Sequence, residues 1–428
     1  MSRRRQAGRF PGDGRYSQGA ILSRGRTDGE RMSGRLAVVK FGGTCLADDA
    51  GRKRAVEHCR ALLEEFEKLV VVVSAMGRQG DPYATDSLSG LVESPLPSEK
   101  DVLLSCGEVI SAVVMAGELR KAGVESRALT GWAAGIETDG THHESEIKKV
   151  YRDRIRAVLE ECSCAVVAGF QGAGPEGNVT TIGRGGSDTT ALALASALDA
   201  DEVILWKTVD SIYSADPSEV PGAVEIRQIS AEDLRQMAWH GAKIVHPRAA
   251  EIAIESGLGI SVRSHGTGKT VTDIEPWILK SGRYIVGVTS GPEVVQFTVE
   301  GKPGEKPSAF FARVFRMVAD AGVSMDMFSV LGSSARFTVP SATADRVSLM
   351  LREAGIDYTA RGPCAKVSIV GAGMHGLRGV MARFSEALHR AGVEMLQTVD
   401  SHATISALVE ADSRVRALEE LHREFIEE

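Results

Sequence analysis

Glycine-rich turns lie beside charged side chains at several places in this sequence, and the combination suits the binding of anions. The first place is the end of the apolar run 36–40, where Lys40 is followed by the letters FGGT. Paired glycines let backbone N–H groups approach an anion, and a lysine supplies a mobile charge for a phosphate. Because the lysine precedes the glycines, the segment is not a Walker A loop. Taken alone, a plain glycine turn with a solvated lysine explains it better.

The second place is the segment 180–190, with the sequence TTIGRGGSDTT, which leads into a helical pattern. Its glycines permit a tight turn, and Ser187, Asp188 and Thr189 are expected to cap the helix. Arg184 offers a planar fork for a carboxylate or a phosphate. Capping explains neither the three glycines nor the arginine, so a binding role is favoured. Asp188 could bridge to a metal or position Lys40.

Two further segments carry charged residues. The letters SCGE end at Glu108, which is predicted to lie in the first turn of a helix, where the helix dipole favours a carboxylate. Acceptance of a hydrogen bond from a substrate ammonium is an equally good interpretation of Glu108. In the segment 241–247 (GAKIVHP), Lys243 could lie over nucleotide phosphates, whereas His246 is expected to be a packed or capping histidine.

The elements that must position these residues alternate between strand and helix. Continuous apolar runs bounded by helical patterns are typical of an open, mostly parallel α/β sheet with helices on both faces. The stretch 266–273 is predicted to be a linker, so that the α/β pattern ends near Arg263. Strands are predicted over 36–40, 70–74, 165–170 and 203–206, and helices over 50–66, 108–122 and 189–198.

Beyond the linker, a pattern of strand, helix, glycine and strand occurs twice. The letters RVFRMVADAGV (313–323) resemble ARFSEALHRAGV (382–393), which predicts two small α+β modules of about 65 residues each. The segment 371–376 (GAGMHG) matches a dinucleotide-binding pattern, but too few residues follow it for a doubly wound sheet. A glycine turn in the second module, which could face an amino-acid effector, is the better interpretation.

Composition excludes several classes. The chain has 428 residues, a net charge of −7 and six scattered cysteines. It is therefore expected to be a cytoplasmic protein without a disulfide scaffold, and its charge argues against a nucleic-acid surface. Its apolar runs are too short to span a bilayer. Residues 1–33 are rich in arginine and are expected to be a disordered tail or an over-long start before Met32, although a basic arm that touches nucleic acid stays open.

Together, the order and spacing of KFGGT, SCGE and GRGGSDT resemble the aspartokinases of the amino-acid kinase family, from about residue 36 to the C-terminus. The segments 74–86 and 397–402 resemble the diaminopimelate-sensitive Gram-positive type. The resemblance implies an amino-acid kinase fold over 34–272, followed by two ferredoxin-like ACT modules over 283–362 and 363–428.

The resemblance also implies the reaction, which is phosphorylation of the β-carboxylate of L-aspartate by ATP with Mg²⁺, a step towards diaminopimelate, lysine, threonine and methionine. Lys40 would neutralise the phosphoryl group and Asp188 would hold Lys40, with no metal bound by the protein itself. Since the acceptor is already an anion, positioning and charge neutralisation do most of the catalysis. The positions matched to aspartate binding are Thr85, Glu108, Arg184 and Ser187, and those matched to ATP binding are Lys40, Gly42, Gly43, Lys207, Thr208, Tyr213 and Lys243.

Some residues depart from the family pattern. Lys207-Thr208 replaces a usual Thr-Asp, and Ser218 replaces a common arginine. Both changes are expected at the adenosine-binding edge, away from the phosphates. They keep open a catalytically weak, amino-acid-sensing regulatory paralogue. A kinase of glutamate, carbamate or a nucleotide is disfavoured by Glu108, Thr85 and the ACT pair. A homodimer joined through the ACT modules is implied, with diaminopimelate, lysine or threonine as effector and with no nucleic-acid or membrane partner.

Overall fold

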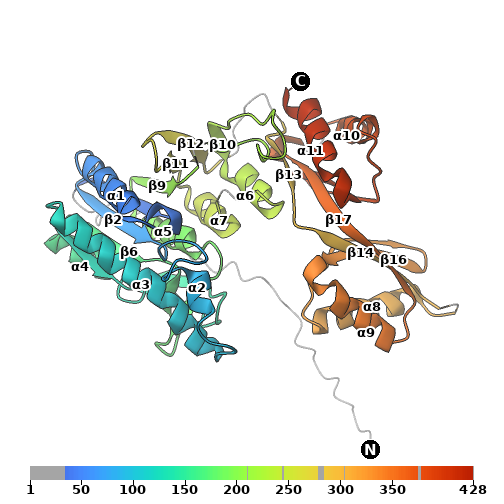
Figure 1. Cartoon of the computed structure of the whole chain (residues 1–428), viewed down its shortest axis with the longest axis horizontal. Coiled ribbons are helices and arrows are strands. Elements are labelled where there is room, and N and C mark those ends of the chain that lie inside the picture. Colours follow the sequence, from blue (N-terminus) through green and yellow to red (C-terminus); the bar gives the residue numbers. More distant parts are fainter. Residues whose placement is uncertain are drawn as a thin grey trace, which may run out of the picture.

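The computed structural model describes residues 34–209, 211–242, 245–277, 284–302, 304–374 and 377–427. Within them, the chain forms two bodies, each built on its own large sheet (Figure 1). The predicted tail, residues 1–33, lies outside the described residues.

The first body contains an eight-stranded sheet in the order β10-β12-β11-β9-β1-β2-β6-β3. All neighbouring pairs are parallel except β11 and β12. The central strands are runs of β-branched residues such as KLVVVV, which suit a strand that is covered on both faces. The strands are β1 (Leu36–Phe41), β2 (Lys68–Val73), β3 (Ser126–Leu129), β6 (Cys164–Ala168), β9 (Glu202–Lys207), β10 (Gln228–Ser230), β11 (Ile260–Ser264) and β12 (Thr270–Glu275).

Helices cover both faces of this sheet, and each face has its own hydrophobic core. Val38 and Val70 pack towards α4, α5 and α7, whereas Val39 and Val71 pack towards α1 and α3. The predicted α/β class is therefore confirmed. The helices are α1 (Asp49–Leu62), α2 (Thr85–Ser89), α3 (Pro97–Lys121), α4 (Arg152–Glu161), α5 (Gly186–Leu198), α6 (Ala231–Trp239) and α7 (Pro247–Ser256), and a four-stranded sheet comprises β4 (Ile136–Thr138), β5 (Ile147–Val150), β7 (Gln171–Ala173) and β8 (Val179–Thr181).

Among the described residues, α3 is the one helix whose length and apolar composition would suit a membrane span. Half of its apolar window is buried in the protein. Its inner side contributes Ala112, Met115 and Leu119 to the core beneath the sheet, as a core helix does.

The second body contains a seven-stranded antiparallel sheet that carries the predicted repeat. Each repeat runs strand, helix, two strands and helix, and each has its own core. The strand β17 pairs with β14 through its first half and with β19 through its second half, so one strand joins the two modules. The elements are β13 (Gly287–Ser290), β14 (Val294–Glu300), α8 (Pro307–Asp320), β15 (Asp326–Leu331), β16 (Ser334–Pro340), α9 (Ala344–Glu353), β17 (Tyr358–Val370), α10 (Val380–Arg390), β18 (Gln397–Asp400), β19 (Thr404–Glu410) and α11 (Arg414–His422).

The predicted linker at 266–273 is wrong. After a turn at 265–268, the chain returns as β12, antiparallel to β11, and remains in the main sheet. Thr270 and Asp273 are exposed, while Val271 and Ile274 are buried. A strand near the edge of the sheet can keep polar residues on its open side. The polar residues of β12 therefore made this segment look like a linker.

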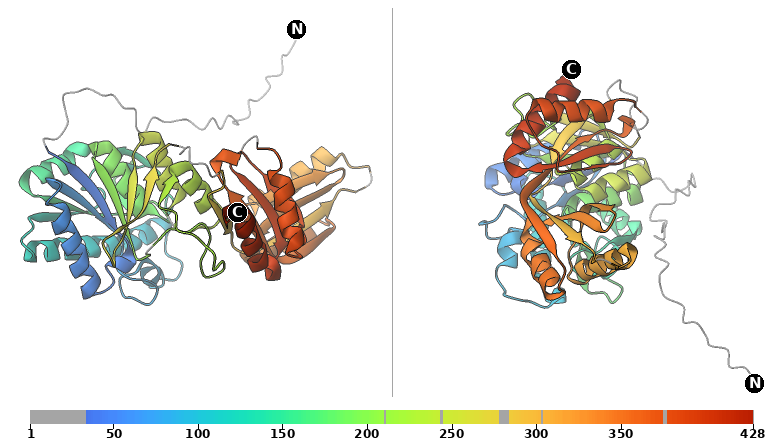
Figure 2. Two further views of the ribbon diagram at one scale, coloured as in Figure 1. Left: turned by 90° about the horizontal axis from the view of Figure 1, so that it is seen from above. Right: turned by 90° about the vertical axis from the view of Figure 1, so that its right-hand side faces the viewer.

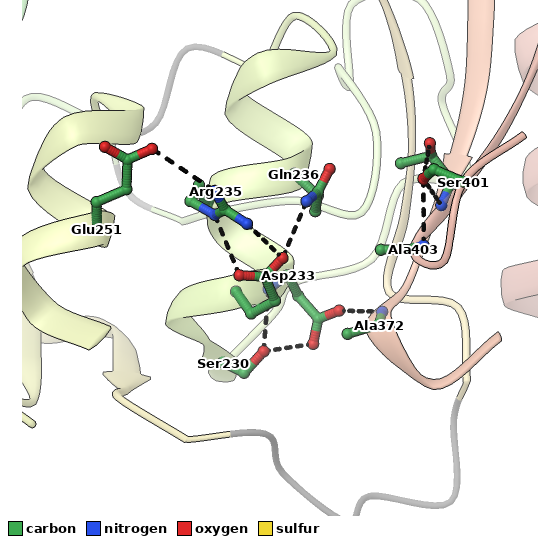
Figure 3. Close-up of polar contacts among 10 residues, drawn as sticks. Ser230, Asp233, Arg235, Gln236, Glu251, Ala372, Ser401 and Ala403 are labelled. Carbon is green, nitrogen blue, oxygen red and sulfur yellow. Dashed lines mark hydrogen bonds and ion pairs between the residues drawn. The ribbon is translucent and has the colours of Figure 1, made fainter. Parts of the chain in front are cut away.

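The two bodies touch through α6 and through the loop between β9 and β10, which contacts α11 (Figures 1 and 2). The Asp233 carboxylate accepts a hydrogen bond at 2.6 Å from the backbone N–H of Ala372 and one at 2.6 Å from Ser230 Oγ (Figure 3). The described part of the glycine motif, which begins at Gly371, therefore contacts the first body. His375 and Gly376 lie outside the described residues.

Candidate active site

Two lysines share one aspartate at the carboxyl edge of the main sheet. Lys40 is near the end of β1, Lys207 ends the neighbouring parallel strand β9, and Asp188 lies in the first turn of α5. Lys40 Nζ is 2.7 Å from Asp188 Oδ1, and Lys207 Nζ is 2.9 Å from Asp188 Oδ2. Ligands of open parallel sheets bind at this edge, so the cluster lies where a substrate is expected.

The charges in this cluster control its protonation. Burial alone would raise the pKa of Asp188, but the charges of Lys207 and Lys40 hold it well below its usual value. Burial also lowers the pKa of Lys207, although the carboxylate beside it opposes this change. The aspartate is therefore ionised, and two lysines beside it leave an excess of positive charge.

The glycine turn after β1 lies directly beside these charges. A Cβ on Gly43 would stand 2.3 Å from the carbonyl oxygen of Ala75, so only glycine allows the two loops to approach so closely. A Cβ on Gly42 would lie 3.7 Å from Lys40 Nζ. The structure thus brings the two glycines and Lys40 together.

Glu108 lies beside the same loops but not where the sequence pattern placed it. The helix α3 begins at Pro97, so Glu108 is in its interior and not in its first turn. The signals for the earlier start are the proline at N1 and Glu99, whose carboxylate accepts a hydrogen bond from the backbone N–H of Leu96 at 3.2 Å. The prediction that Glu108 lies in the first turn and is stabilised by the helix dipole is therefore wrong.

Glu108 is instead a buried acid with one unused oxygen. The residue is 2% exposed, and Oε1 accepts a hydrogen bond from Ala75 N at 3.0 Å. Oε2 has no hydrogen-bond partner among the described residues. Burial raises the pKa of Glu108 to about 8, and the Ala75 N–H and the charge of Lys40 offset only part of this effect. A buried acceptor without a partner is costly unless a ligand supplies the donor.

The loop before Thr85 packs on α3 beside Glu108, because α3 has a glycine next to that residue. A Cβ on Gly107 would stand 2.9 Å from the carbonyl oxygen of Tyr83, so a larger side chain would push the loop away. Thr85 follows that loop as the half-buried first residue of α2.

Arg184 and Ser187 lie in and just beyond the turn between β8 and α5. Arg184 is exposed, between two glycines with φ values of 82° and 71°. Ser187 is buried, and a Cβ on Gly169 would stand 2.9 Å from it. The N-cap of α5 is Gly185, so the predicted capping by Ser187, Asp188 and Thr189 is wrong. These residues lie inside the helix, where Asp188 can pair with the lysines.

Lys207 also differs from its prediction. We expected it at the adenosine-binding edge, but its ammonium lies at Asp188. Thr208 is exposed, with Oγ1 3.4 Å from Thr44 Oγ1. Tyr213 is half-buried and forms an isolated antiparallel bridge with Glu225.

Of the remaining predicted positions, Ser218 and His246 lie within the described residues. The Ser218 hydroxyl and N–H both donate to Asp216 within a turn. His246 is the N-cap of α7 and accepts a hydrogen bond from Arg248 N, so the capping interpretation is confirmed. Lys243 lies outside the described residues.

Sequence reasoning missed a buried cluster around Asp101, one turn before Ser105 on α3. Asp101 is fully buried and accepts a hydrogen bond from Thr181 Oγ1 at 2.5 Å. It also contacts Nδ1 of His142 and His143 at 2.5 and 3.0 Å. The sequence does contain a signal for this cluster. If the helix begins at Pro97, positions 101, 105 and 108 lie on one face, so Asp101 is expected on the same side as Glu108.

This cluster supports the turn that carries Arg184. His143 has a φ of 68°, a conformation that costs free energy for a residue other than glycine. Its carbonyl oxygen would be 3.0 Å from a Cβ on Gly183, next to Arg184. The Asp101 cluster thus supports the turn at Gly183 and Arg184 through the backbone of His143.

A parallel sheet with two lysines, a bridging aspartate and a glycine turn at its carboxyl edge defines the class of small-molecule kinases. Comparison with known proteins agrees. The amino acid kinase family model matches residues 35–264, and an ACT domain model matches residues 367–425. Aspartokinase 1 of Bacillus subtilis (strain 168) is 41% identical over 401 residues, which are 91% of this chain and 99% of that protein. The aspartokinase of Geobacillus stearothermophilus is 35% identical over 405 residues, 91% of this chain and 97% of that protein.

The chain therefore belongs to the amino acid kinase family and, within it, to the aspartokinases. Solved structures share the fold. Escherichia coli aspartokinase III in complex with aspartate and ADP (R-state) has a TM-score of 0.75 at 22% identity, covering 92% of this chain and all of that one. Clostridium acetobutylicum aspartate kinase has a TM-score of 0.74 at 21% identity, covering 91% of this chain and all of that one. The recognition made from the motifs is confirmed at the level of the family.

Proposed function

We infer that this protein is an aspartate kinase, which transfers the γ-phosphoryl group of ATP to the β-carboxylate of L-aspartate and forms 4-phospho-L-aspartate. The observation that carries this inference is the pairing of two complementary sites across one loop. Ala75 donates its N–H to Glu108, and its carbonyl packs on Gly43 beside Lys40. A site for an ammonium and a site for phosphates therefore adjoin, as the two substrates require.

The main barrier to this reaction is the approach of two anions. A carboxylate oxygen attacks the γ-phosphorus and ADP leaves, so no strong base is needed. We propose that Lys40 neutralises the transferring group, assisted by the backbone amides of Gly42 and Gly43. Asp188 holds Lys40 in a fixed orientation, which removes the reorganisation that a free lysine would require.

We propose that aspartate is held by four residues at the carboxyl edge of the sheet, three of them in helices. The unused Glu108 Oε2 accepts from the substrate ammonium, and Arg184 grips a carboxylate through its planar fork. The hydroxyl groups of Thr85 and Ser187 supply further polar contacts to the substrate. This arrangement fixes the β-carboxylate in line with the phosphate.

We propose that ATP lies along the glycine turn and the β9 edge. Its contacts are Lys40, Gly42, Gly43, Lys207, Thr208, Tyr213 and Lys243. Both oxygens of Asp188 are paired with lysines, so Mg²⁺ is best carried into the site by the ATP phosphates. The ion would supply further charge neutralisation.

We propose that the second body senses an amino-acid effector, which is diaminopimelate, lysine or threonine. The E. coli enzyme was solved with lysine and aspartate in a T-state. In this chain, a pocket between α6 and the first module is lined by His240, Asp326 and Lys366. Its Lys366–Asp326 ion pair, at 2.7 Å, offers both charges that a zwitterion needs. We propose that the kinase domain covers residues 34–275, three residues beyond its predicted end at 272, because β12 stays in the main sheet to Glu275. The ACT modules are proposed at 283–362 and 363–428, in a cytoplasmic homodimer.

The test of the reaction is trapping of the acyl phosphate with hydroxylamine, in the presence of aspartate, ATP and Mg²⁺. Lys40→Ala and Asp188→Ala are expected to abolish hydroxamate formation. Lys53→Ala, which removes an exposed lysine of α1, is the matched control and should leave the rate unchanged. A wild-type protein that makes no hydroxamate with ATP or GTP but binds an effector would instead be a regulatory paralogue.

A further inference from the structure

Lys207 and Lys40 hold the same carboxylate from opposite sides. Asp188 offers one oxygen to each lysine, at 2.9 and 2.7 Å. We propose that Lys207 is a second catalytic cation, which contacts the transferring phosphate of ATP and not its adenosine end. This inference rests on the proposed kinase function and adds to it a specific partner for the phosphate.

The register of the sheet places Lys207 on the phosphate side. In the parallel pair of β1 and β9, Lys40 lies opposite Leu205. Lys207 is two residues further along β9, so it projects from the same face as Lys40, one side-chain layer nearer the carboxyl edge. The turn after β1 adjoins this layer, because Cys45 Sγ donates to the carbonyl oxygen of Trp206 at 3.6 Å and Thr44 Oγ1 lies 3.4 Å from Thr208 Oγ1.

The exposure of the two lysines supports the same assignment. The Lys40 side chain is 8% exposed, whereas that of Lys207 is 21% exposed. Lys207 therefore keeps an open side after it has paired with Asp188. A lysine has three N–H donors, and Asp188 uses only part of this capacity.

The charge balance calls for an anion. Among the described residues, Asp188 is the one carboxylate that forms an ion pair with either lysine. Two cations and one anion leave one positive charge uncompensated in a place that is largely shielded from water. An uncompensated buried charge is costly, and a phosphate group removes the cost. Burial and the nearby charge of Lys40 lower the pKa of Lys207, which agrees with an excess of positive charge there.

A purely structural role for Lys207 would be to hold Asp188 in place. The two roles differ in whether the effect of Lys207 depends on Lys40, because Asp188 also holds Lys40. A lysine that contacts the terminal phosphate itself should strengthen ATP binding even in a Lys40→Met background. A lysine that only orients Asp188 acts through Lys40, so Lys207→Met should then change ATP affinity no further in that background.

The experiment compares Lys207→Met, alone and in a Lys40→Met background, with Lys207→Arg and the surface control Lys53→Met in the full-length protein. Affinities for AMP, ADP and a non-hydrolysable ATP analogue are measured by calorimetry, and kcat is measured by hydroxamate formation. For Lys207→Met we expect kcat to fall on the order of a hundredfold, as when one stabilising donor is removed. Affinity for the ATP analogue should fall about tenfold or more while AMP affinity is unchanged. Lys207→Arg should recover part of the ATP affinity.

Three results would overturn the proposal. One is equal affinity changes, or none, for AMP and the ATP analogue. Another is no further loss of affinity for the ATP analogue when Lys207→Met is added to Lys40→Met, and the third is an unchanged kcat in Lys207→Met. The nucleotide titrations do not require turnover, so they remain informative if a variant is inactive, and circular dichroism verifies that each variant is folded. An inactive wild-type protein would refute the proposed function, whereas an active wild type with a fully active Lys207→Met would refute this inference alone.

Discussion

Binding of aspartate is expected to release a proton from Glu108. Burial in the interior of α3 raises the pKa of this residue from its usual 4.5 to about 8. At pH 7 the empty site therefore holds a largely neutral carboxylic acid. A substrate ammonium at the unused Oε2 stabilises the ionised form, so binding and ionisation are linked and the proton leaves to solvent.

The size of the effect follows from the pKa. With a value of about 8, roughly nine in ten molecules carry the proton at pH 7, so about 0.9 proton is released per aspartate bound. The apparent affinity for aspartate should fall about tenfold for each pH unit below 8. Relative to high pH, binding is then weaker by about 10-fold at pH 7 and about 100-fold at pH 6.

The same pKa affects folding stability. The folded protein binds this proton more tightly than the unfolded chain does. The resulting stabilisation is complete below pH 4.5 and is lost as the pH rises through about 8. The whole difference is about 5 kcal/mol. Glu108→Gln should remove this pH dependence from the free energy of unfolding.

Calorimetry of aspartate binding at pH 7, in two buffers with different ionisation enthalpies, counts the protons released. The wild type should release close to one proton, and Glu108→Gln should release none and bind aspartate more weakly. Glu118→Gln, further along the same helix, is the control and should behave as the wild type. If the wild type and Glu108→Gln release the same number of protons, the assignment of Glu108 is refuted.

Two further predictions concern the loops around the site. Gly43→Ala would place a Cβ 2.3 Å from Ala75 O, so it should lower the free energy of unfolding by about 1–3 kcal/mol and also lower kcat/KM. Gly117→Ala, with open space around it, is the control, and chemical denaturation should show no loss of stability. His422→Phe removes the 2.7 Å contact between His422 Nε2 and Ser214 Oγ, next to Tyr213. We expect the free energy of unfolding to fall by about 1–3 kcal/mol and the KM for ATP to rise. An equal rise in the KM for aspartate would contradict this prediction.

The layers of the first body could be predicted from the sequence because strands buried on both faces must be continuously apolar. Runs such as LAVVKF show this directly. The start of α3 could not be found from periodicity, because Asp101 is polar yet fully buried, and its burial depends on hydrogen bonds from distant residues such as Thr181. Only the tertiary structure supplies these partners. For the same reason, the Asp101 cluster was missed as a support for the site.

The position of Lys207 shows why motif matching alone did not place its ammonium beside Asp188. The face on which a strand residue lies depends on its parity, and a shift by one residue would move it to the other side of the sheet. In β9 the parity is held by Trp206, whose ring stacks 3.9 Å from His58 of α1 and 5.9 Å from Phe41. With Trp206 fixed on the α1 face, Lys207 must project towards α5, where Asp188 lies. The aromatic stack on one side of the sheet therefore decides that the ammonium of Lys207 reaches Asp188 on the other.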